Sequence, residues 1–158
     1  APFWDIRASN LSFPIIISSI FNKVTLHLGV KEIYMLPHKL NAVIIDDELS
    51  GRTMIEFYLK EFMGDLFENL VAVSNIKDAA KAISDLKPHI IFSDYELRGE
   101  NGLMVQDHLD EDTPVVVVSA HSQYAVEAIH SNVLDYLLKP LNESEMLRFR
   151  KRLIKRFE

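Results

Sequence analysis

Three aspartates, a serine and a lysine follow short apolar runs at four places in this 158-residue chain. In chain order they are Asp46 and Asp47, Asp94, Ser119, and Lys139. Carboxylates within a few ångströms of one another repel, so they either take up protons or hold a cation. Oxygen ligands favour a hard cation, and a few carboxylates completed by water suit Mg²⁺ better than zinc.

Such a group could accept a phosphoryl group. A bound Mg²⁺ would attract phosphoryl oxygens and leave one carboxylate as the nucleophile. The Lys139 ammonium and the Ser119 hydroxyl would hold the other oxygens as charge develops. The sequence has no glycine-rich phosphate loop and no Walker lysine, so it does not predict a nucleotide cleft. The chemistry indicated is phosphorylation of an aspartate.

Each of these residues also has a purely structural interpretation. Asp46 or Asp47 could favour a helix dipole. Asp94 could cap a turn, Ser119 could cap the next helix, and Lys139 could be a solvated loop residue. The combination favours function, because parallel strands bring their carboxyl ends to one edge of a sheet, where ligands bind.

Five apolar, β-branched runs predict the strands that position these groups. They are Leu40–Ile45, Leu70–Val73, His89–Phe92, Pro114–Val118 and Leu134–Leu138. Nearly continuous apolar character is typical of strands buried on both faces. Helical spacing recurs between them, and Asn142 and Glu145 resemble a capping box for a last helix. Strict alternation of five strands with five helices predicts an α/β fold with a parallel sheet covered on both faces.

Composition and charge narrow the class of protein. The chain is 48% apolar and 25% charged, as in globular proteins, and has no cysteine. It therefore has no disulfide or cysteine metal site, which fits a cytoplasmic protein. No apolar run approaches the ~20 residues of a membrane span. Residues 40–142 hold seven lysines and arginines against eighteen acids, which disfavours direct nucleic-acid binding and suits a cation or a basic partner.

Four segments, in order, resemble the receiver domains of two-component response regulators. They are Val43–Glu48, Ile90–Leu97 followed by Asn101 and Gly102, Val115–Ala120, and Asp135–Pro140. The resemblance covers residues 40–158 and implies a flavodoxin-like (βα)5 doubly wound sheet with strand order 2-1-3-4-5. Residues 1–39, which lack a clear period, are expected to be an N-terminal extension: a tag, a linker or translation from an upstream start. The alternative is a small packed extension using Trp4, Phe13 and Ile15 to Ile17.

The resemblance implies a phosphoacceptor and a metal site. Asp94 would take the phosphoryl group from a histidine kinase or a phosphotransfer protein. Asp46 and Asp47 would position Mg²⁺, with Asp94 and the backbone carbonyl of Glu96 completing the protein ligands.

The same resemblance implies a switch. Lys139 would pair with phosphoryl oxygens, and its bond to Pro140 would be cis. Ser119 would hydrogen-bond the phosphoryl group, and Tyr136 would turn inward and rearrange the surface of the fourth and fifth helices. Alternatively, Tyr136 could be an aromatic residue of the strand that serves only in packing.

Three positions beside the acceptor carry further expectations. The residue after Leu97 is usually proline in this family and is Arg98 here, so we expect a looser or differently shaped loop. Glu96 and His121 would lie beside the phosphoryl group, where family members tune its lifetime. His121 could equally be a solvated residue at a helix start.

The runs 121–129 and 134–140 are similar to receivers of the LytTR group, whose effector is a DNA-binding domain joined after the last helix. We therefore expect a transcriptional regulator whose effector lies outside this chain. The last helix carries six basic residues between Arg148 and Arg156. They predict a solvated face, or ion pairing with a second receiver that would allow a homodimer on phosphorylation.

Two other functions remain open from the residues. A pseudo-receiver would bind partners without phosphorylation, although the intact set of five groups argues against it. An aspartyl-phosphate phosphatase resembling haloacid dehalogenases needs an acid two residues after a first-strand nucleophile. Glu48 follows Asp46, and Glu96 follows Asp94, at that spacing. The leading interpretation is a phosphoacceptor that assists its own phosphorylation and dephosphorylation, not a turnover enzyme.

Overall fold

The computed structural model describes residues 36–158 in full and only the backbone of residues 23–24 and 33–34. Residues 23–24 and 33–34 pair antiparallel as strands β1 (Lys23–Val24) and β2 (Ile33–Tyr34). The alternative of packing through Trp4 and Phe13 falls outside the described residues. The assignment of residues 1–39 as an extension therefore stays a prediction.

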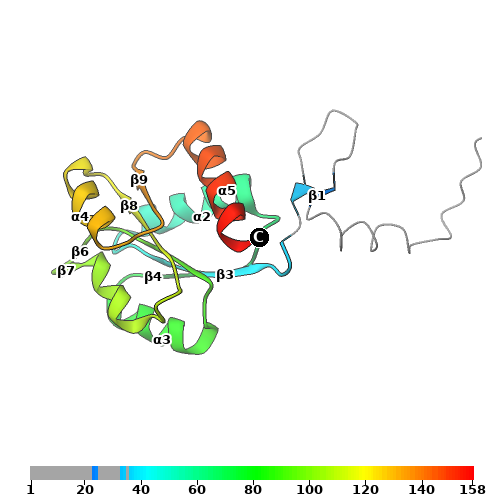
Figure 1. The fold of residues 1–158 in the computed structure, drawn as a ribbon. Coiled ribbons are helices and arrows are strands. Elements are labelled where there is room, and N and C mark those ends of the chain that lie inside the picture. The colour runs from blue at the N-terminus through cyan, green and yellow to red at the C-terminus, as the bar shows by residue number, and fades with distance from the viewer. Residues whose placement is uncertain (1–22, 25–32, 35) are drawn as a thin grey trace, which may run out of the picture.

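A five-stranded parallel sheet forms the centre of the fold (Figure 1). Its strands are β3 (Leu40–Ile45), β4 (Phe67–Val73), β5 (Ile90–Ser93), β8 (Val115–Ser119) and β9 (Asp135–Leu138). They lie in the order β4-β3-β5-β8-β9. Numbered along the chain this is 2-1-3-4-5, which confirms the predicted doubly wound fold. Strand β4 begins at Phe67, three residues before the predicted start at Leu70. The prediction began too late because Glu68 and Asn69 are exposed polar residues that interrupt the apolar pattern.

Helices cover both faces of the sheet, as predicted. Helices α2 (Leu49–Met63) and α5 (Glu143–Phe157) pack on one face, and α3 (Ile76–Leu86) packs on the other (Figure 1). Along β3, Ala42 and Ile44 face α2 and α5, while Val43 and Ile45 belong to the core beneath α3. This alternation of two buried faces explains why the strand sequences are apolar throughout.

The third connection departs from the expected α-helix. A hairpin of β6 (Glu96–Leu97) and β7 (Glu100–Asn101) occupies its first part, and a 3-10 helix, η1 (Gly102–His108), follows. The hairpin shortens the segment left for a helix, and that segment contains glycine, valine and aspartate, which are weak helix formers. The next connection holds a 3-10 turn, η2 (Ser122–Tyr124), and a short helix, α4 (Ala125–His130).

Helix α5 starts and packs as its sequence predicts. The side chain of Asn142 accepts a hydrogen bond from the Glu145 N–H at 3.0 Å. The predicted basic face is partly bound within the chain: both Arg150 Nη atoms contact the Asp65 carboxylate, at 2.7 and 2.6 Å. Arg152 pairs with Asp135 at 2.7 Å. These two arginines therefore have acidic partners within the chain, and pairing of the basic face with a second receiver stays a prediction. Across residues 36–158, no helix has the length and apolar character needed to cross a membrane.

We predict that Phe149→Ala costs about 3–5 kcal/mol of the free energy of unfolding, because the change leaves a cavity between α5 and the sheet. Phe149 is fully buried and meets the Phe92 ring edge to face at 5.8 Å. Phe57→Ala on the outside of α2, where the ring is 58% exposed, is the matched control and should cost under 1 kcal/mol. Urea unfolding measures both values. Equal losses would show that α5 does not depend on this contact.

Candidate functional site

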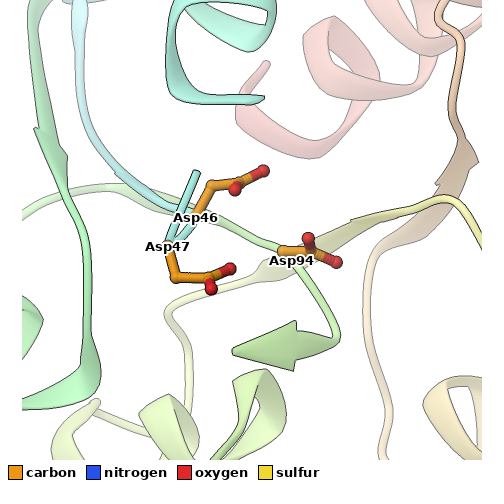
Figure 2. Close-up of side chains that lie close together, drawn as sticks. All are labelled: Asp46, Asp47 and Asp94. Carbon is orange, nitrogen blue, oxygen red and sulfur yellow. The ribbon is translucent and has the colours of Figure 1, made fainter. Parts of the chain in front are cut away.

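Three aspartates meet at the carboxyl edge of the sheet. Asp46 and Asp47 follow β3, and Asp94 follows its neighbour β5 (Figure 2). One carboxylate oxygen from each lies within 4.8 Å of the other two. Opposite ligands of a Mg²⁺ ion lie about 4.2 Å apart, so small side-chain rotations would let all three contact one ion. The donor set, all carboxylate oxygens, fits a hard cation.

Lys139 brings a positive charge into this acidic centre from the end of β9. Its Nζ donates to Oδ2 of Asp46 at 2.6 Å and to Oδ2 of Asp94 at 3.0 Å. Burial works to lower the pKa of Lys139, but the hydrogen bonds to Asp46 and Asp94 outweigh it and raise the pKa above its ordinary value. The ammonium therefore stays charged between the two acids. The Lys139–Pro140 peptide bond is cis.

The surroundings of Asp94 shift its pKa. Burial raises the pKa of Asp94 above its ordinary value, and the charge of Asp46 adds to this rise. The hydrogen bond and charge of Lys139 and the N–H of Glu96 oppose the rise only in part. Asp94 is therefore a partly desolvated carboxylate held beside an ammonium.

Asp46 is held more tightly than its neighbours, by residues that the sequence did not single out. It is completely buried, and its Oδ1 accepts from the Glu48 N–H at 2.9 Å. Arg52 donates to its carbonyl oxygen at 2.7 Å. Gly51 lets α2 pass directly over the carboxylate, because a Cβ at this position would lie 2.1 Å from Asp46 Oδ2. An isolated glycine inside a helical pattern was the signal that could have identified this contact.

A second glycine packs against the backbone of Asp94. A Cβ on Gly102 would lie 1.7 Å from the carbonyl oxygen of Asp94. Ser93, fully buried, donates its hydroxyl to the Asp94 carbonyl at 3.0 Å and contacts the Gly102 carbonyl at 3.2 Å. The β6–β7 hairpin therefore closes tightly behind Asp94 and fixes where its side chain can point.

Ser119 and Tyr136 lie on the neighbouring strands β8 and β9. Ser119 is fully buried, and its Oγ accepts from the His121 N–H at 3.2 Å, so it also caps the following turn. The Tyr136 hydroxyl donates to the carbonyl oxygen of His121. Burial raises the pKa of Tyr136, and the charges of Asp94 and Glu96 contribute. Both side chains thus contact the short segment that leads from β8 into α4.

A group of tyrosines and acids beside the site was not foreseen. Glu96 accepts from the Tyr124 hydroxyl at 2.5 Å and pairs with His121 at 3.1 Å, so His121 is not simply a solvated residue. The Tyr124 ring stacks on Tyr95 at 4.0 Å, and Tyr95 donates to Glu127 at 2.5 Å. These contacts join segments about thirty residues apart, and no local pattern announces them.

The turn at Arg98 is tight, so the loop is not looser, and a shape that differs from the family's stays a prediction. Arg98 and Gly99 form the two-residue connection between β6 and β7. Gly99 adopts φ +79°, a left-handed conformation that favours glycine. The Arg98 Nε lies 3.8 Å from Oδ2 of Asp47.

A doubly wound sheet with three carboxylates and a lysine at its carboxyl edge defines a class of signalling domain. The profile of the response regulator receiver domain matches residues 42–149. The chain therefore belongs to the response regulator receiver family of two-component systems. Domains of this family generally bind Mg²⁺ through acidic residues and interact with histidine kinases.

Relatives in sequence include transcriptional regulators. The chain is 34% identical to the transcriptional regulatory protein LytR of Staphylococcus aureus over 110 residues, 68% of this chain and 44% of that protein. It is also 34% identical to a response regulatory protein of Vibrio cholerae over 118 residues, 73% of this chain and 49% of that one. The chain thus spans about half the length of these curated relatives.

Solved structures share the fold at lower identity. NtrX from Brucella abortus superposes with a TM-score of 0.63 at 24% identity, covering 75% of this chain and 27% of that one. A chemotaxis response regulator of Vibrio cholerae gives 0.60 at 18% identity, covering 73% and 99%. At these identities the likeness supports the fold alone.

We predict that Gly51→Ala destabilises the protein by about 1–3 kcal/mol, although alanine is ordinarily the better helix residue. The added Cβ would overlap the buried Asp46 carboxylate. In an Asp46→Ala background the same change should cost much less, or stabilise. A double-mutant cycle by urea unfolding measures this coupling. Additive effects would mean that α2 does not press on Asp46.

Proposed function

We propose that this receiver domain accepts a phosphoryl group on Asp94 with the help of Mg²⁺, and that phosphorylation switches the surface formed by α4, β9 and α5. The observation that carries the proposal is the position of the Lys139 ammonium, hydrogen-bonded to both Asp46 and Asp94 beside the three clustered carboxylates. Nothing in the packing of the core requires a half-buried lysine between two acids at this edge.

The transfer step follows from the position of Asp94. A carboxylate oxygen of Asp94 attacks the phosphorus of a phosphohistidine on a histidine kinase or phosphotransfer protein. The new O–P bond forms as the N–P bond breaks, and the electron pair stays on the imidazole nitrogen, which takes a proton from solvent. Mg²⁺ held by Asp46, Asp47, Asp94 and the Glu96 carbonyl would supply positive charge to the phosphoryl oxygens.

The chain's own residues stabilise the product. Lys139 already contacts Asp94 and is charged, so it can pair with a phosphoryl oxygen without leaving its site. We propose that Ser119 rotates to donate its hydroxyl to the phosphoryl group and in doing so exchanges the bond that it accepts from the His121 N–H. Because Tyr136 bonds the carbonyl of the same His121, this exchange would move Tyr136 and α4 together.

The output we propose is transcriptional. Similarity to LytR and the match of residues 121–129 and 134–140 to the LytTR group support a DNA-binding effector that belongs to the half of the relatives outside this chain. The acidic charge of residues 40–142 leaves direct DNA binding to that effector. We place the switch in the cytoplasm, where phosphodonors are made.

Neither alternative function suits the site as well. In a phosphatase, the acid two residues after the nucleophile must be free to move a proton. The carboxylate of Glu96 is instead bound by His121 and Tyr124. A pseudo-receiver would not need Lys139 to contact two acids, as it does here.

We predict that incubation with a small phosphodonor and Mg²⁺ adds one hydroxylamine-labile phosphoryl group, seen by intact mass. Asp94→Asn should abolish the gain, because an amide oxygen is a poor nucleophile, and chelation of Mg²⁺ should do the same. Asp107→Asn, a change at an exposed aspartate in η1, is the matched control and should leave the gain intact. Absence of an adduct in the native chain would favour the pseudo-receiver.

We predict that phosphorylation doubles the solution mass measured by light scattering. Four exposed apolar residues on α4, β9 and α5 would be buried in the dimer: Val126, Ile129, Leu138 and Leu147. Ile129→Glu, at a residue 66% exposed, should leave the phosphorylated chain monomeric. Phe57→Glu on α2 is the control and should still dimerise. A phosphorylated native chain that stays monomeric contradicts this surface.

A further inference from the structure

Arg98 occupies a backbone position that would accept proline. It is the second residue of the turn 97–100, and the third, Gly99, has φ +79°. Turns with a left-handed third residue commonly carry proline in the second position. The tight β6–β7 hairpin shows that the backbone here needs no residue of special shape at Arg98. What the arginine adds is its side chain.

That side chain lies beside the acidic centre. The Arg98 Nε is 3.8 Å from Oδ2 of Asp47, while Lys139 contacts Asp46 and Asp94 from the other side. All three carboxylates therefore have a cation of the chain itself within ion-pairing distance. Three carboxylates and two cations leave the cluster with one formal negative charge, where an acidic centre without these cations would carry three.

The two cations differ in how firmly they are held. The Lys139 side chain is 17% exposed and bonds two acids, whereas the Arg98 side chain is 88% exposed and makes one long contact. Exposed pairs of this kind contribute at most about 1 kcal/mol and are screened by salt. Arg98 can therefore leave Asp47 easily, but while it is close it weakens the attraction of Asp47 for any other cation.

We propose that Arg98 is a tethered competitor of Mg²⁺: its guanidinium neutralises Asp47 and raises the Mg²⁺ concentration needed to fill the acidic site. The inference rests on the proposed function, since it concerns the same metal site. Because the competitor is attached to the hairpin directly behind Asp94, the competition is present at every Mg²⁺ concentration. It makes phosphorylation more sensitive to Mg²⁺ and to salt than the three carboxylates alone would.

The test is calorimetric titration of the 158-residue chain with MgCl₂ alone, in low and high salt. Arg98→Gln should bind Mg²⁺ about three- to tenfold more tightly than the native chain in low salt. The variant lacks the repulsion between the guanidinium and the metal ion, which is twice as large for a divalent as for a monovalent cation. The difference should shrink toward about twofold or less in high salt. Thermal unfolding without metal checks that the variant folds, as expected for so exposed a residue.

Two variants separate a local effect from a general one. Arg98→Lys keeps the charge at the turn and should bind Mg²⁺ within about twofold of the native chain. Lys155→Gln removes the same charge from an exposed position in the last turn of α5, toward the opposite edge of the sheet, and should leave Mg²⁺ affinity unchanged.

The outcomes distinguish this inference from the proposed function. Equal Mg²⁺ affinity of native chain and Arg98→Gln, or weaker binding by the variant, overturns the inference alone. An equal gain in Lys155→Gln also overturns it, because the effect would then be one of net charge. Absence of Mg²⁺ binding in every chain overturns the metal site and the inference with it.

Discussion

The site depends on one ammonium held between two carboxylates. Asp46, Asp47 and Asp94 stand at the ends of two adjacent parallel strands, so the register of β3 on β5 forces like charges together at a half-buried edge. Carboxylates this close repel one another, which destabilises their charged forms unless a cation is near. Lys139 supplies that cation from β9, across the width of the sheet. The strand order brings the ammonium and the acids to the same edge, and the unfavourable charge cluster persists because the buried core of the sheet fixes it there.

Close backbone approach is the second requirement of this arrangement. Gly51 admits the first turn of α2 over Asp46, and Gly102 admits the hairpin end behind Asp94. Neither position could take a side chain without displacing an acid or its carbonyl. The glycines therefore convert a general edge of an α/β sheet into a site with fixed carboxylate positions, and a fixed position is what lets a carboxylate act as a nucleophile in one direction only.

The surroundings of the acidic centre link it to the remainder of the domain in two ways. On one side, Tyr136 and Ser119 both bond to the backbone of His121, in the segment that leads from β8 to α4. On the other side, the Arg98 guanidinium lies 3.8 Å from the Asp47 carboxylate. Both links involve residues outside the five groups, His121 and Arg98, and both follow from segments that the sheet brings together.

The sequence alone determined the fold class and predicted that Asp46, Asp47, Asp94 and Lys139 meet at one edge of the sheet, because buried parallel strands have a distinct apolar pattern and their carboxyl ends lie together. It missed the exposed start of β4 and the 3-10 connection at η1, where an edge position and weak helix formers blur the pattern. Tertiary structure alone decided that Gly51 contacts Asp46, that Glu96 is bound by His121 and Tyr124, and that Arg98 reaches Asp47. The contacts of Glu96 and Arg98 join segments far apart in the chain, and no local spacing of residue types encodes them, whereas Gly51 left only the weak signal of a glycine inside a helical pattern.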